Sequence, residues 1–506
     1  MNGNEDAPRT SHTTDRSLTD EVEVAVVGAG PTGLTLAGML SGYGIQTAVL
    51  DSAAGPAPHS RAAVVHARTL ETLEPLGVAD EMIGGGVVVP HFGVRDRDRL
   101  LLGVDFDGLS TTHPYTLMLP QDRTERILLG ALREQGGRLL WEHEAVGLTQ
   151  DEGGVELVVR GERRVRARYV VGCDGGHSFV RGALGIPFQG ETYPQSFVLA
   201  DVRMSWALPD DEVQLFFSPE GLVVVAPLPQ GRHRVVATVD EAPAVPSLSN
   251  VQELLDARGP QAPRPRVEEV LWSSRFRVQH RIAASFREGG VFLCGDAAHV
   301  HSPAGGQGMN TGIQDAANLA WKLALAVGGL APGSLLDSYE RERRPVAKGV
   351  VSTTDRLTRL ATVRSPLLRR LRNALLPLAG RAGRLPRRLA KNLSELDVAY
   401  PAGWSVDGSK RVERWAPKGQ GVLSGLDPAL ALLVPEHQEK RAAEDAARFR
   451  TLPVRVVPRS HLGHAALLRP DGYVAGRAAP DQHAQLLELL ARALGFRLVK
   501  SVPTAT

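Results

Sequence analysis

Three glycine-rich segments hold the residues whose types and spacing could do chemistry. They are residues 28–33 (GAGPTG), 173–178 (CDGGHS) and 295–299 (GDAAH). In the first segment, Gly28 permits a tight turn, Gly30 lets the backbone approach a pyrophosphate, and Gly33 lets a helix pack closely on a strand. Together the three segments predict one dinucleotide site assembled from distant parts of the chain.

The elements around the first segment are those that such a site requires. An apolar run at 23–27 predicts a buried strand before it, and residues 34–41 predict a helix after it. Pro31 and Thr32 then stand at the helix start, where free backbone N–H groups face the phosphates. Proline is tolerated there because the N–H that it lacks would have no partner within the helix. A second apolar strand ends at Asp51, where an acid accepts hydrogen bonds from a ribose. Glycines at this spacing also end ordinary strands, but strand, helix and acid together favour the dinucleotide site.

Composition excludes several classes of protein. The 506 residues are 43% hydrophobic, which fits a globular chain of several domains. The formal net charge of +2 is too small to produce the positive electrostatic field that nonspecific nucleic-acid binding requires. The two cysteines, Cys173 and Cys294, form no CxxC pair and no metal-ligand pattern. Residues 1–20 are polar and indicate a disordered tail, and no apolar run approaches the roughly 20 residues that span a bilayer. We therefore expect a cytoplasmic protein without metal, nucleic acid or stable membrane insertion.

The order of strand and helix signals predicts an α/β fold with an insertion. These signals alternate over 21–185, which we assign to the first part of a Rossmann-like nucleotide-binding domain. Residues 186–285 are rich in β-formers separated by Gly, Pro and Asp, which predicts an inserted antiparallel β-sheet that walls a substrate pocket. Residues 286–400 return to strand, glycine loop and long helix and end in a helical segment, and we assign them to the second part of the nucleotide-binding domain. Residues 401–506 are assigned to a separate C-terminal domain.

Several motifs spread over most of the chain resemble one enzyme family. They are 60–71 (SRAAVVHARTLE), 113–115 (HPY), 120–125 (PQDRTE), 173–181 (CDGGHSFVR), 295–310 (GDAAHVHSPAGGQGMN), 339–345 (YERERRP) and 396–401 (LDVAYP). In this order they are similar to the para-hydroxybenzoate hydroxylase superfamily, the group A flavoprotein monooxygenases, and most to its actinobacterial branch of aromatic polyketide hydroxylases. The resemblance implies that the nucleotide-binding domain holds FAD.

The resemblance also implies which residues bind the cofactor and act in catalysis. The cofactor-binding residues are Gly28, Gly30, Pro31, Thr32, Gly33, Asp51, Arg61, Gln121, Val146, Asp174, Asp296, Gly306, Gly308, Met309 and Asn310. Arg61 is implied beside the flavin and the pyridine nucleotide, and Pro303 beside the substrate, so both are assigned catalytic roles. Arg61 could instead be a solvated charge, and Gln121 a surface helix start. Asp174, Asp296 and Pro303 could be ordinary turn or cap residues.

The implied activity is aromatic hydroxylation. NADPH or NADH reduces FAD, the reduced flavin reacts with O2 to give a C4a-hydroperoxide, and this species hydroxylates an electron-rich ring. The branch implies a polycyclic aromatic, polyketide-type substrate and a place in antibiotic or other secondary-metabolite biosynthesis. Baeyer-Villiger oxygenation, antibiotic inactivation and a non-catalytic flavin-binding protein remain as alternatives. The sequence leaves open the substrate, the position oxidised, the pocket residues, the choice of nicotinamide and whether the chain forms a homodimer.

Two segments outside the glycine motifs are also informative. In the polyketide branch the C-terminal region is thioredoxin-like, and 466–475 (ALLRPDGYVA) resembles its late hairpin with a tight Asp-Gly turn. This region has no cysteine, so a redox role is excluded and a structural or interaction role remains. Residues 367–391 are rich in Leu and Arg and are interrupted by Pro377 and Pro386. They predict either short helices that cover the flavin domain or a helix at a membrane surface.

Overall fold

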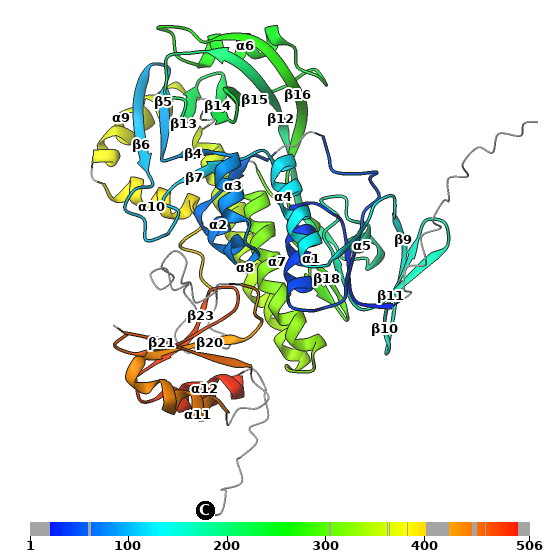
Figure 1. Ribbon diagram of the computed structural model, residues 1–506. Coiled ribbons are helices and arrows are strands. Elements are labelled where there is room, and N and C mark those ends of the chain that lie inside the picture. The colour runs from blue at the N-terminus through cyan, green and yellow to red at the C-terminus, as the bar shows by residue number, and fades with distance from the viewer. Residues whose placement is uncertain are drawn as a thin grey trace, which may run out of the picture.

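The computed structural model describes residues 21–58, 62–302, 305–361, 363, 365–381, 383–400, 425–447, 453–460 and 462–493. Arg61, Pro303 and the tail 1–20, about which the sequence made predictions, lie outside the described residues. The strands of the described residues form two eight-stranded sheets, one four-stranded sheet and one three-stranded sheet. The two large sheets lie in different layers of the molecule and meet at the site described below (Figure 1).

The first sheet carries the nucleotide-binding core. Its strands lie in the order β17, β18, β11, β1, β2 and β8, all parallel except β17, and β9 and β10 extend β11 on the side. The bounds are β1 (Glu21–Val27), β2 (Thr47–Leu50), β8 (Arg138–Leu140), β9 (Ala145–Asp151), β10 (Gly154–Val159), β11 (Arg163–Gly172), β17 (Arg287–Glu288) and β18 (Val291–Leu293). β1 and β2 are almost continuously apolar because a parallel strand covered by helices is buried on both faces. Both strands predicted around the first glycine segment are confirmed.

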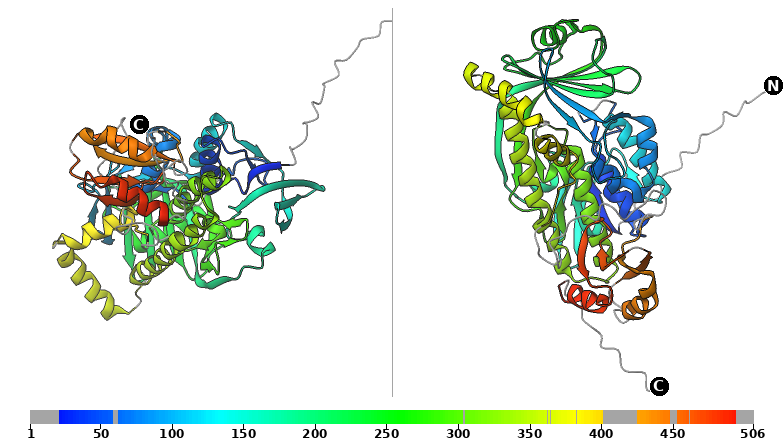
Figure 2. Two further views of the ribbon diagram at one scale, coloured as in Figure 1. Left: turned by 90° about the horizontal axis from the view of Figure 1, so that it is seen from below. Right: turned by 90° about the vertical axis from the view of Figure 1, so that its left-hand side faces the viewer.

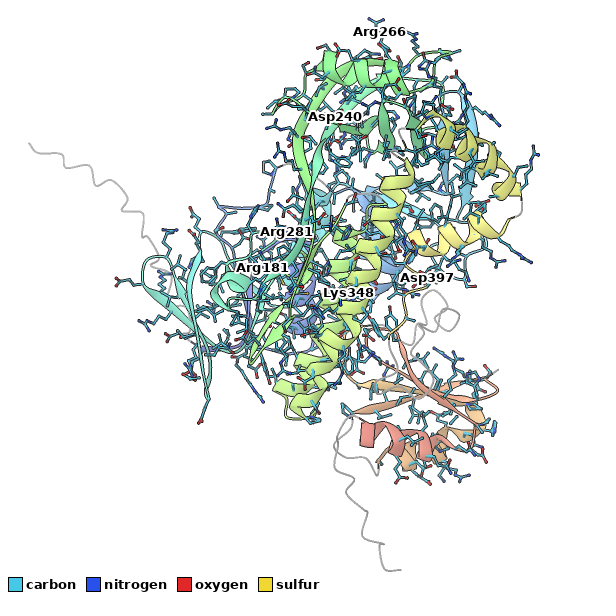
Figure 3. The ribbon with its side chains drawn as sticks, turned by 180° about the vertical axis from the view of Figure 1, so that it is seen from behind. Arg181, Asp240, Arg266, Arg281, Lys348 and Asp397 are labelled. Carbon is cyan, nitrogen blue, oxygen red and sulfur yellow. The ribbon has the colours of Figure 1, made fainter. Side chains whose placement is uncertain are left out.

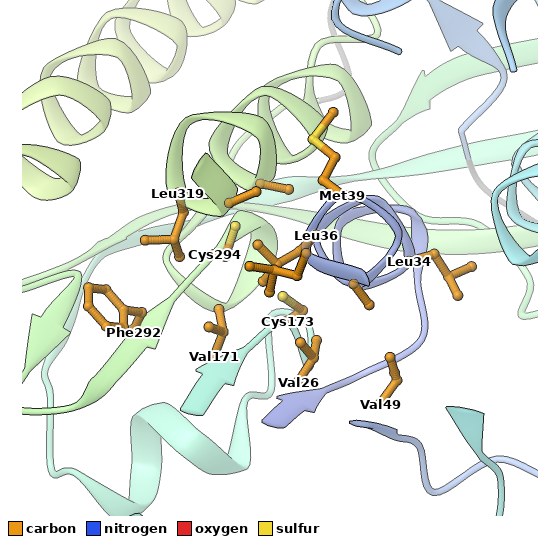
Figure 4. Close-up of a cluster of buried hydrophobic side chains, with 14 of the residues drawn as sticks. Val26, Leu34, Leu36, Met39, Val49, Val171, Cys173, Phe292, Cys294 and Leu319 are labelled. Atoms are coloured by element: carbon orange, nitrogen blue, oxygen red, sulfur yellow. The ribbon is translucent and has the colours of Figure 1, made fainter. Parts of the chain in front are cut away.

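Three helices pack against this sheet and contribute apolar side chains to the hydrophobic core. They are α1 (Pro31–Gly42), α4 (Gln121–Glu134) and α7 (Gly308–Val327). α1 has Pro31 in its first turn, as predicted, and α7 is the long helix expected after the third glycine segment. Figure 4 shows Leu36 of α1 and Leu319 of α7 packed around the two buried cysteines. Both cysteines are thus core residues in these glycine segments.

Two strands of 18 residues each lead from the first domain into the second sheet. They are β12 (Phe188–Ser205) and β16 (Arg266–Ala283), which pair antiparallel along their length. The full order is β19, β16, β12, β15, β14, β13, β5 and β6. The other bounds are β5 (His91–Asp96), β6 (Arg99–Asp105), β13 (Glu212–Ser218), β14 (Gly221–Leu228), β15 (Arg232–Val239) and β19 (His299–Val300). α6 (Leu248–Arg258) covers the outer face of this sheet (Figure 1).

The second sheet differs from the predicted insertion in two ways. Strands β5 and β6 come from before residue 186 and β19 from after residue 285, and β13 pairs with β5 in parallel rather than antiparallel. The prediction of an antiparallel sheet made by 186–285 alone is therefore corrected. The physical reason is that alternation of apolar residues predicts a strand but carries no information about a partner far away in the sequence.

Short elements connect the two large sheets. A three-stranded sheet has the order β3, β7 and β4. The bounds are β3 (Val64–Val65), β4 (Val87–Val89), β7 (Thr116–Met118), α2 (Ala67–Leu73), α3 (Ala79–Gly85) and α5 (Phe179–Ala183). These elements place the segment after Arg61 against the start of α7, as shown in the next subsection.

Three helices follow α7 and lead away from the first sheet. They are α8 (Asp337–Ala361), α9 (Pro366–Arg381) and α10 (Arg384–Leu393). Pro377 lies inside α9 without ending it. α9 and α10 pack on β6 of the second sheet (Figure 1), and α10 also contacts the flavin domain, where Gln307 donates to the carbonyl of Asn392 at 3.4 Å. None of the helices in the described ranges is long and apolar enough to cross a bilayer.

A small C-terminal domain lies at the opposite end of the molecule from the second sheet (Figure 2). Its strand order is β21, β20, β22 and β23, with β20 and β21 parallel and the other pairs antiparallel. The bounds are β20 (Leu430–Pro435), α11 (Glu439–Ala447), β21 (Val454–Arg459), β22 (Ala465–Leu468), β23 (Val474–Ala478) and α12 (His483–Ala493). Trp321 of α7 packs into its core, and Arg469 donates to Glu342 of α8 at 2.8 Å. The domain is therefore docked on the flavin domain by apolar and charged contacts.

Candidate active site

The first glycine loop shows three different uses of glycine. Gly28 has φ +105°, and a Cβ there would lie 2.4 Å from the carbonyl oxygen of Cys173. A Cβ at Gly33 would lie 2.0 Å from the carbonyl oxygen of Gly28. At Gly30 a Cβ would meet no atom within 4 Å. Gly28 and Gly33 therefore serve the packing of loop, strand and helix, whereas Gly30 leaves open space above the start of α1.

The acid predicted at the end of β2 lies directly beside this loop. Asp51 accepts a hydrogen bond from the backbone N–H of Ala29 at 2.7 Å and another from Ala53 at 2.8 Å. These two bonds fix the carboxylate in orientation. Because each carboxylate oxygen has a second lone pair, Asp51 retains the capacity to accept from a ribose hydroxyl.

Arg181 joins the second and third glycine segments, and sequence reasoning gave it no role. Its guanidinium donates to the carbonyl of Gly176 at 2.8 Å and to the carbonyl of Ala297 at 2.9 Å. Its guanidinium also lies over the ring of Phe188, 3.8 Å from the centroid. Figure 3 shows Arg181 at the base of the long strands, near Arg281. The segments are thus held together by a side chain that was quoted only as part of a motif.

Asp174 and Asp296 occupy different positions relative to the site. The Asp174 carboxylate accepts from the backbone N–H of Val180 at 3.0 Å at the start of α5, and burial raises its pKa. Its neighbours Cys173 and Gly175 line the cavity described below, as does Asp296. Asp174 therefore acts on the turn in this structure, whereas Asp296 stands at the cavity itself.

The third loop turns sharply before α7. Gly306 has φ +65°, and a Cβ there would lie 2.6 Å from the side chain of Val64. Asn310, fully buried, donates to the carbonyls of Val64 and Gly306 at 2.9 and 2.7 Å. Its side-chain oxygen accepts from the backbone N–H of His66 at 2.8 Å. Asn310 thus locks the loop onto β3, which places the start of α7 at the cavity.

His66, the residue between β3 and α2, holds the third loop, and sequence reasoning gave it no role. Its Nε2 donates to the carbonyl of Gly305 at 2.8 Å, which leaves Nδ1 as an acceptor facing the Thr116 hydroxyl at 3.4 Å. Burial lowers the pKa of His66 to about 4, so the ring is neutral at pH 7. No local signal could have found this role, because the partner Gly305 is 239 residues away.

A buried cluster of charged side chains holds the third glycine segment, residues 295–299, in place. Asp315 of α7 accepts from His299 at 2.6 Å and from the backbone N–H of Gly295 at 3.3 Å, and it is paired with Arg343 of α8. Burial opposes ionisation of Asp315, but the charges of Arg343 and His299 outweigh it and lower the pKa of this carboxyl. His299 therefore serves as a hydrogen-bonding residue in this structure, and the loop is held by the fixed carboxylate of Asp315.

A cavity of about 640 Å³ lies between the first domain and the second sheet. One side, the glycine wall, is formed by Gly30, Pro31, Thr32, Gly175, Asp296, Gly305, Gly306, Gly308 and Met309. The other side, the sheet wall, is formed mainly by apolar side chains of the second sheet, including Phe92, Val94, Phe197, Leu215, Phe217, Val224, Arg234 and Phe276. The cavity therefore joins the predicted dinucleotide site to an apolar chamber.

Arg234 is the one arginine among the described residues of the sheet wall. It is 4% exposed and donates from Nε and from a terminal nitrogen to the two oxygens of Asp201, at 2.7 and 2.9 Å. This bidentate pair fixes the plane of the guanidinium. His301, also at the cavity, donates from Nδ1 to the carbonyl of Ser302 at 2.9 Å, and burial lowers its pKa to about 4. Both residues are polar groups that the sequence did not point to.

The remaining predicted residues divide into two groups. Gln121 lines the cavity and donates to Glu125 at 2.8 Å along α4. Val146 is 43% exposed in β9, at the register shift opposite Val158 and Val159, and does not line the cavity. The structure therefore brings Gln121 to the site, and it places Val146 on a strand outside the cavity.

The geometry of the glycine wall is suited to binding FAD. Gly30 leaves open space at the start of α1, and no side chain of the described residues caps α1 or α7. Backbone N–H groups of both helix starts are therefore available to an anion. The apolar chamber beside them has room for a flat ring system, as a flavin requires.

Comparisons with known proteins agree with this geometry. A family model described as an FAD binding domain matches residues 21–354. The 12-dehydrotetracycline 5-monooxygenase/anhydrotetracycline 6-monooxygenase of Streptomyces rimosus is 35% identical over 497 residues, covering 91% of this chain and 96% of that enzyme. A rifampicin monooxygenase of Streptomyces venezuelae is 35% identical over 488 residues, covering 93% and 97%.

A solved structure extends the likeness to the whole architecture. The OxyS anhydrotetracycline hydroxylase from Streptomyces rimosus superposes with a TM-score of 0.76 at 33% identity, over 94% of this chain and 99% of that one. The chain belongs to the FAD-dependent aromatic polyketide hydroxylases of the group A flavoprotein monooxygenase family and is an FAD-dependent aromatic monooxygenase.

Proposed function

We propose that this enzyme hydroxylates a polycyclic aromatic, polyketide-type substrate in the biosynthesis of an antibiotic or another secondary metabolite. The observation that carries the proposal is the cavity of about 640 Å³, in which the apolar sheet wall faces the glycine wall. Such a volume lies within the usual range of small-molecule sites, and its aromatic and aliphatic lining suits a flat fused-ring ligand. The names of the tetracycline-pathway relatives support the same substrate class.

FAD would be held by the residues of the glycine wall and its support. We propose the pyrophosphate at Gly28, Gly30, Pro31, Thr32 and Gly33, and the ribose at Asp51. Backbone or side-chain contacts from Gln121, Val146, Asp174 and Asp296 are proposed for the rest of the cofactor. The bound flavin supplies hydride acceptance from NADPH or NADH and activation of O2.

The start of α7 has an electrostatic role in this proposal. Gly308, Met309 and Asn310 present the first-turn N–H groups of a 20-residue helix to the cavity edge, and Gly306 lies in the loop just before it. A helix N-terminus carries a partial positive charge, which stabilises negative charge at the flavin edge facing it. His66 and Asn310 hold that helix start in place through the bonds described above.

The sheet wall orients the substrate and excludes water. Its apolar side chains bury the rings, and Arg234 offers a fixed positive charge to an oxygen of a phenol or enol. Arg61 beside the flavin and nicotinamide, and the Pro303 carbonyl beside the substrate, keep the roles that the resemblance implies.

We propose that the C-terminal domain is thioredoxin-like and structural. The order β21, β20, β22, β23, with one parallel and two antiparallel pairs and helices α11 and α12, supports this assignment. The region has no cysteine for disulfide exchange. Domain boundaries near 185, 285 and 400 are proposed with it, with β5 and β6 added to the substrate domain.

The direct experiment is turnover with a panel of candidate substrates. FAD-loaded enzyme is mixed with NADPH or NADH, in air, with tetracycline-type polycycles, angucycline-type quinones, rifampicin and simple phenols, and products are identified by mass and structure. We expect a polycycle to accelerate nicotinamide oxidation and to gain one oxygen as a hydroxyl. An ester or lactone product would instead establish Baeyer-Villiger oxygenation, and stimulation by rifampicin alone would establish an antibiotic-modifying role. Nicotinamide oxidation that no compound accelerates would contradict the proposal.

A further inference from the structure

Helix α9 is fixed to the protein by one side only. Arg372 donates to the carbonyl of Leu360 at 2.9 Å and lies over the ring of Phe217, 4.9 Å from its centroid. Asn373 bonds the carboxylate of Asp96 at the β5 end of the second sheet. Leu376 packs with the apolar cluster beneath. These contacts define a single inner face and hold the helix against the substrate sheet.

The outer face of α9 is a row of exposed leucines. Their exposed fractions are 75% at Leu367, 55% at Leu368, 53% at Leu371, 52% at Leu375 and 59% at Leu378. At 100° per residue these five side chains fall within an arc of about 100°. α9 lies at the periphery in both the front and the back view (Figures 1 and 3). Contiguous exposed apolar surface of this kind marks an interaction site.

The sequence around this helix has an extreme charge balance. Residues 356–394 contain ten arginines and Lys391 and no acidic residue. The whole chain has 58 Lys and Arg against 56 Asp and Glu, so the rest of the molecule holds 47 cations against 56 acids. Arg370 and Arg381 of α9 and Arg384, Arg387 and Arg388 of α10 are exposed. The segment that contains α9 and α10 is therefore strongly basic, whereas the rest of the chain has a net negative charge.

We propose that the outer face of α9 docks on an anionic lipid surface, with α10 adding positive charge. A helix that lies in the membrane interface has leucines on one face and arginines flanking them, which is the arrangement seen here. Each basic side chain close to an anionic bilayer adds about 1 kcal/mol of attraction. A second copy of the chain fits this surface poorly, because a two-fold interface would place the same basic helix against itself.

The position of the helix relates docking to the cavity. Phe217, which lies under Arg372 of α9, lines the cavity, and so do Leu389 and Leu393 of α10. Lipid contact would therefore occur just outside the chamber. Binding to vesicles needs no turnover, so its test succeeds or fails independently of the proposed function.

The experiment is cosedimentation of full-length, FAD-loaded protein with vesicles. One set contains phosphatidylcholine alone, and the other an equal mixture of phosphatidylcholine and phosphatidylglycerol. We expect binding to the anionic set at least about tenfold tighter than to the neutral set, and weakened by salt. The variant L371N/L375N/L378N should lose about tenfold or more in partitioning. Leu489→Asn, at a leucine of α12 that is 51% exposed, is the matched control and should bind as the parent does.

A second pair of variants separates charge from apolar contact. R381E/R388E should weaken anionic binding by about tenfold, whereas R163E/R164E, at exposed arginines of β11 in the nucleotide-binding sheet, away from α9 in Figure 1, should change it little. Flavin absorbance and circular dichroism verify that each variant is folded. Absence of binding to anionic vesicles, or equal binding by the parent and the leucine variant, would overturn the proposal. So would a dimer, seen by analytical ultracentrifugation, that the leucine variant converts to monomer.

Discussion

The two walls of the cavity are built from different materials. The glycine wall presents backbone atoms and helix starts, held in place by buried polar bonds such as those of His66 and Asn310. The sheet wall presents apolar side chains on strands from two separate parts of the chain. Backbone geometry suits a cofactor that is constant, whereas side chains on a rigid sheet suit a substrate that differs between relatives.

This difference implies that cofactor binding and substrate binding can be damaged separately. Changes in the glycine wall or in the loop behind it should affect FAD affinity or the fold itself, because Gly28 and Gly33 of that loop have no room for a Cβ. Changes in the sheet wall should affect KM for the substrate and leave FAD affinity unchanged. The following variants test that separation, in order of expected effect.

The largest effect is expected at Gly33. Gly33→Ala puts a Cβ 2.0 Å from the carbonyl oxygen of Gly28, so we expect the free energy of unfolding to fall by more than about 4 kcal/mol, measured by urea denaturation. Gly30→Ala is the matched control. Its Cβ meets no protein atom, so the fold should be retained while FAD affinity falls by about tenfold, measured by flavin fluorescence. Equal stability of the two variants would contradict the assignment of these glycines.

The next effect is expected at Arg234 of the sheet wall. Arg234→Met leaves the Asp201 carboxylate, which is 8% exposed, without its cation, and should cost about 3–5 kcal/mol of unfolding free energy. The double variant R234M/D201L removes both charges and should recover most of that stability. If Arg234 also positions the substrate, the double variant should bind FAD normally but show a raised KM. A normal KM in a stable double variant would assign Arg234 a purely structural role.

The third effect concerns pH and the support of the glycine wall. The pKa of His66 is about 4 in the folded protein against 6.5 for the free side chain, so the unfolded state binds more protons between these values. The stability that His66 contributes is therefore complete above pH 6.5 and is lost as pH falls. Between pH 7 and pH 5 the loss is about 2 kcal/mol. His66→Gln keeps an amide donor for Gly305 and removes this dependence.

The measurement is the difference in unfolding free energy between the parent and His66→Gln at each pH. Using the difference cancels the contributions of other titrating groups. The parent should lose about 2 kcal/mol relative to the variant on acidification. Parallel pH profiles for the two proteins would show that His66 is not held in its neutral form.

The smallest effect is expected at a single apolar position of the sheet wall. Leu215→Asn places an amide in the chamber and should raise KM for the aromatic substrate by about tenfold, with FAD affinity unchanged. Leu271→Asn, on the same sheet but outside the cavity and 37% exposed, should leave both quantities unchanged. A loss of FAD affinity in Leu215→Asn would mean that the two walls are not independent.

The same contrast explains what the sequence could predict. The dinucleotide site could be predicted from the sequence because its constraints are local. The loop 28–33, its flanking strand and helix, and Asp51 all lie within one βαβ unit. The motif resemblance supplied the rest of the glycine wall. The supports Arg181 and His66 were not recognised, since their partners Ala297 and Gly305 lie far along the chain.

The sheet wall could be predicted only as a class of structure. The β-rich composition of residues 186–285 indicated a sheet, and the structure contains β13 and β14 there. The addition of β5 and β6, and the inward direction of Leu215 and Arg234, depend on long-range pairing that local patterns do not encode. The residues that line the pocket could therefore be identified only from the structure.

The most direct test of the central claim is the source of the oxygen in the product. FAD-loaded enzyme, NADPH and the best substrate of the panel are allowed to react under ¹⁸O2, and the product is analysed by mass spectrometry. If the two walls bring reduced flavin and the aromatic ring together, one ¹⁸O atom should enter each product molecule for each NADPH consumed, with little free hydrogen peroxide. Product without label, or NADPH consumed with only hydrogen peroxide formed, would contradict the account.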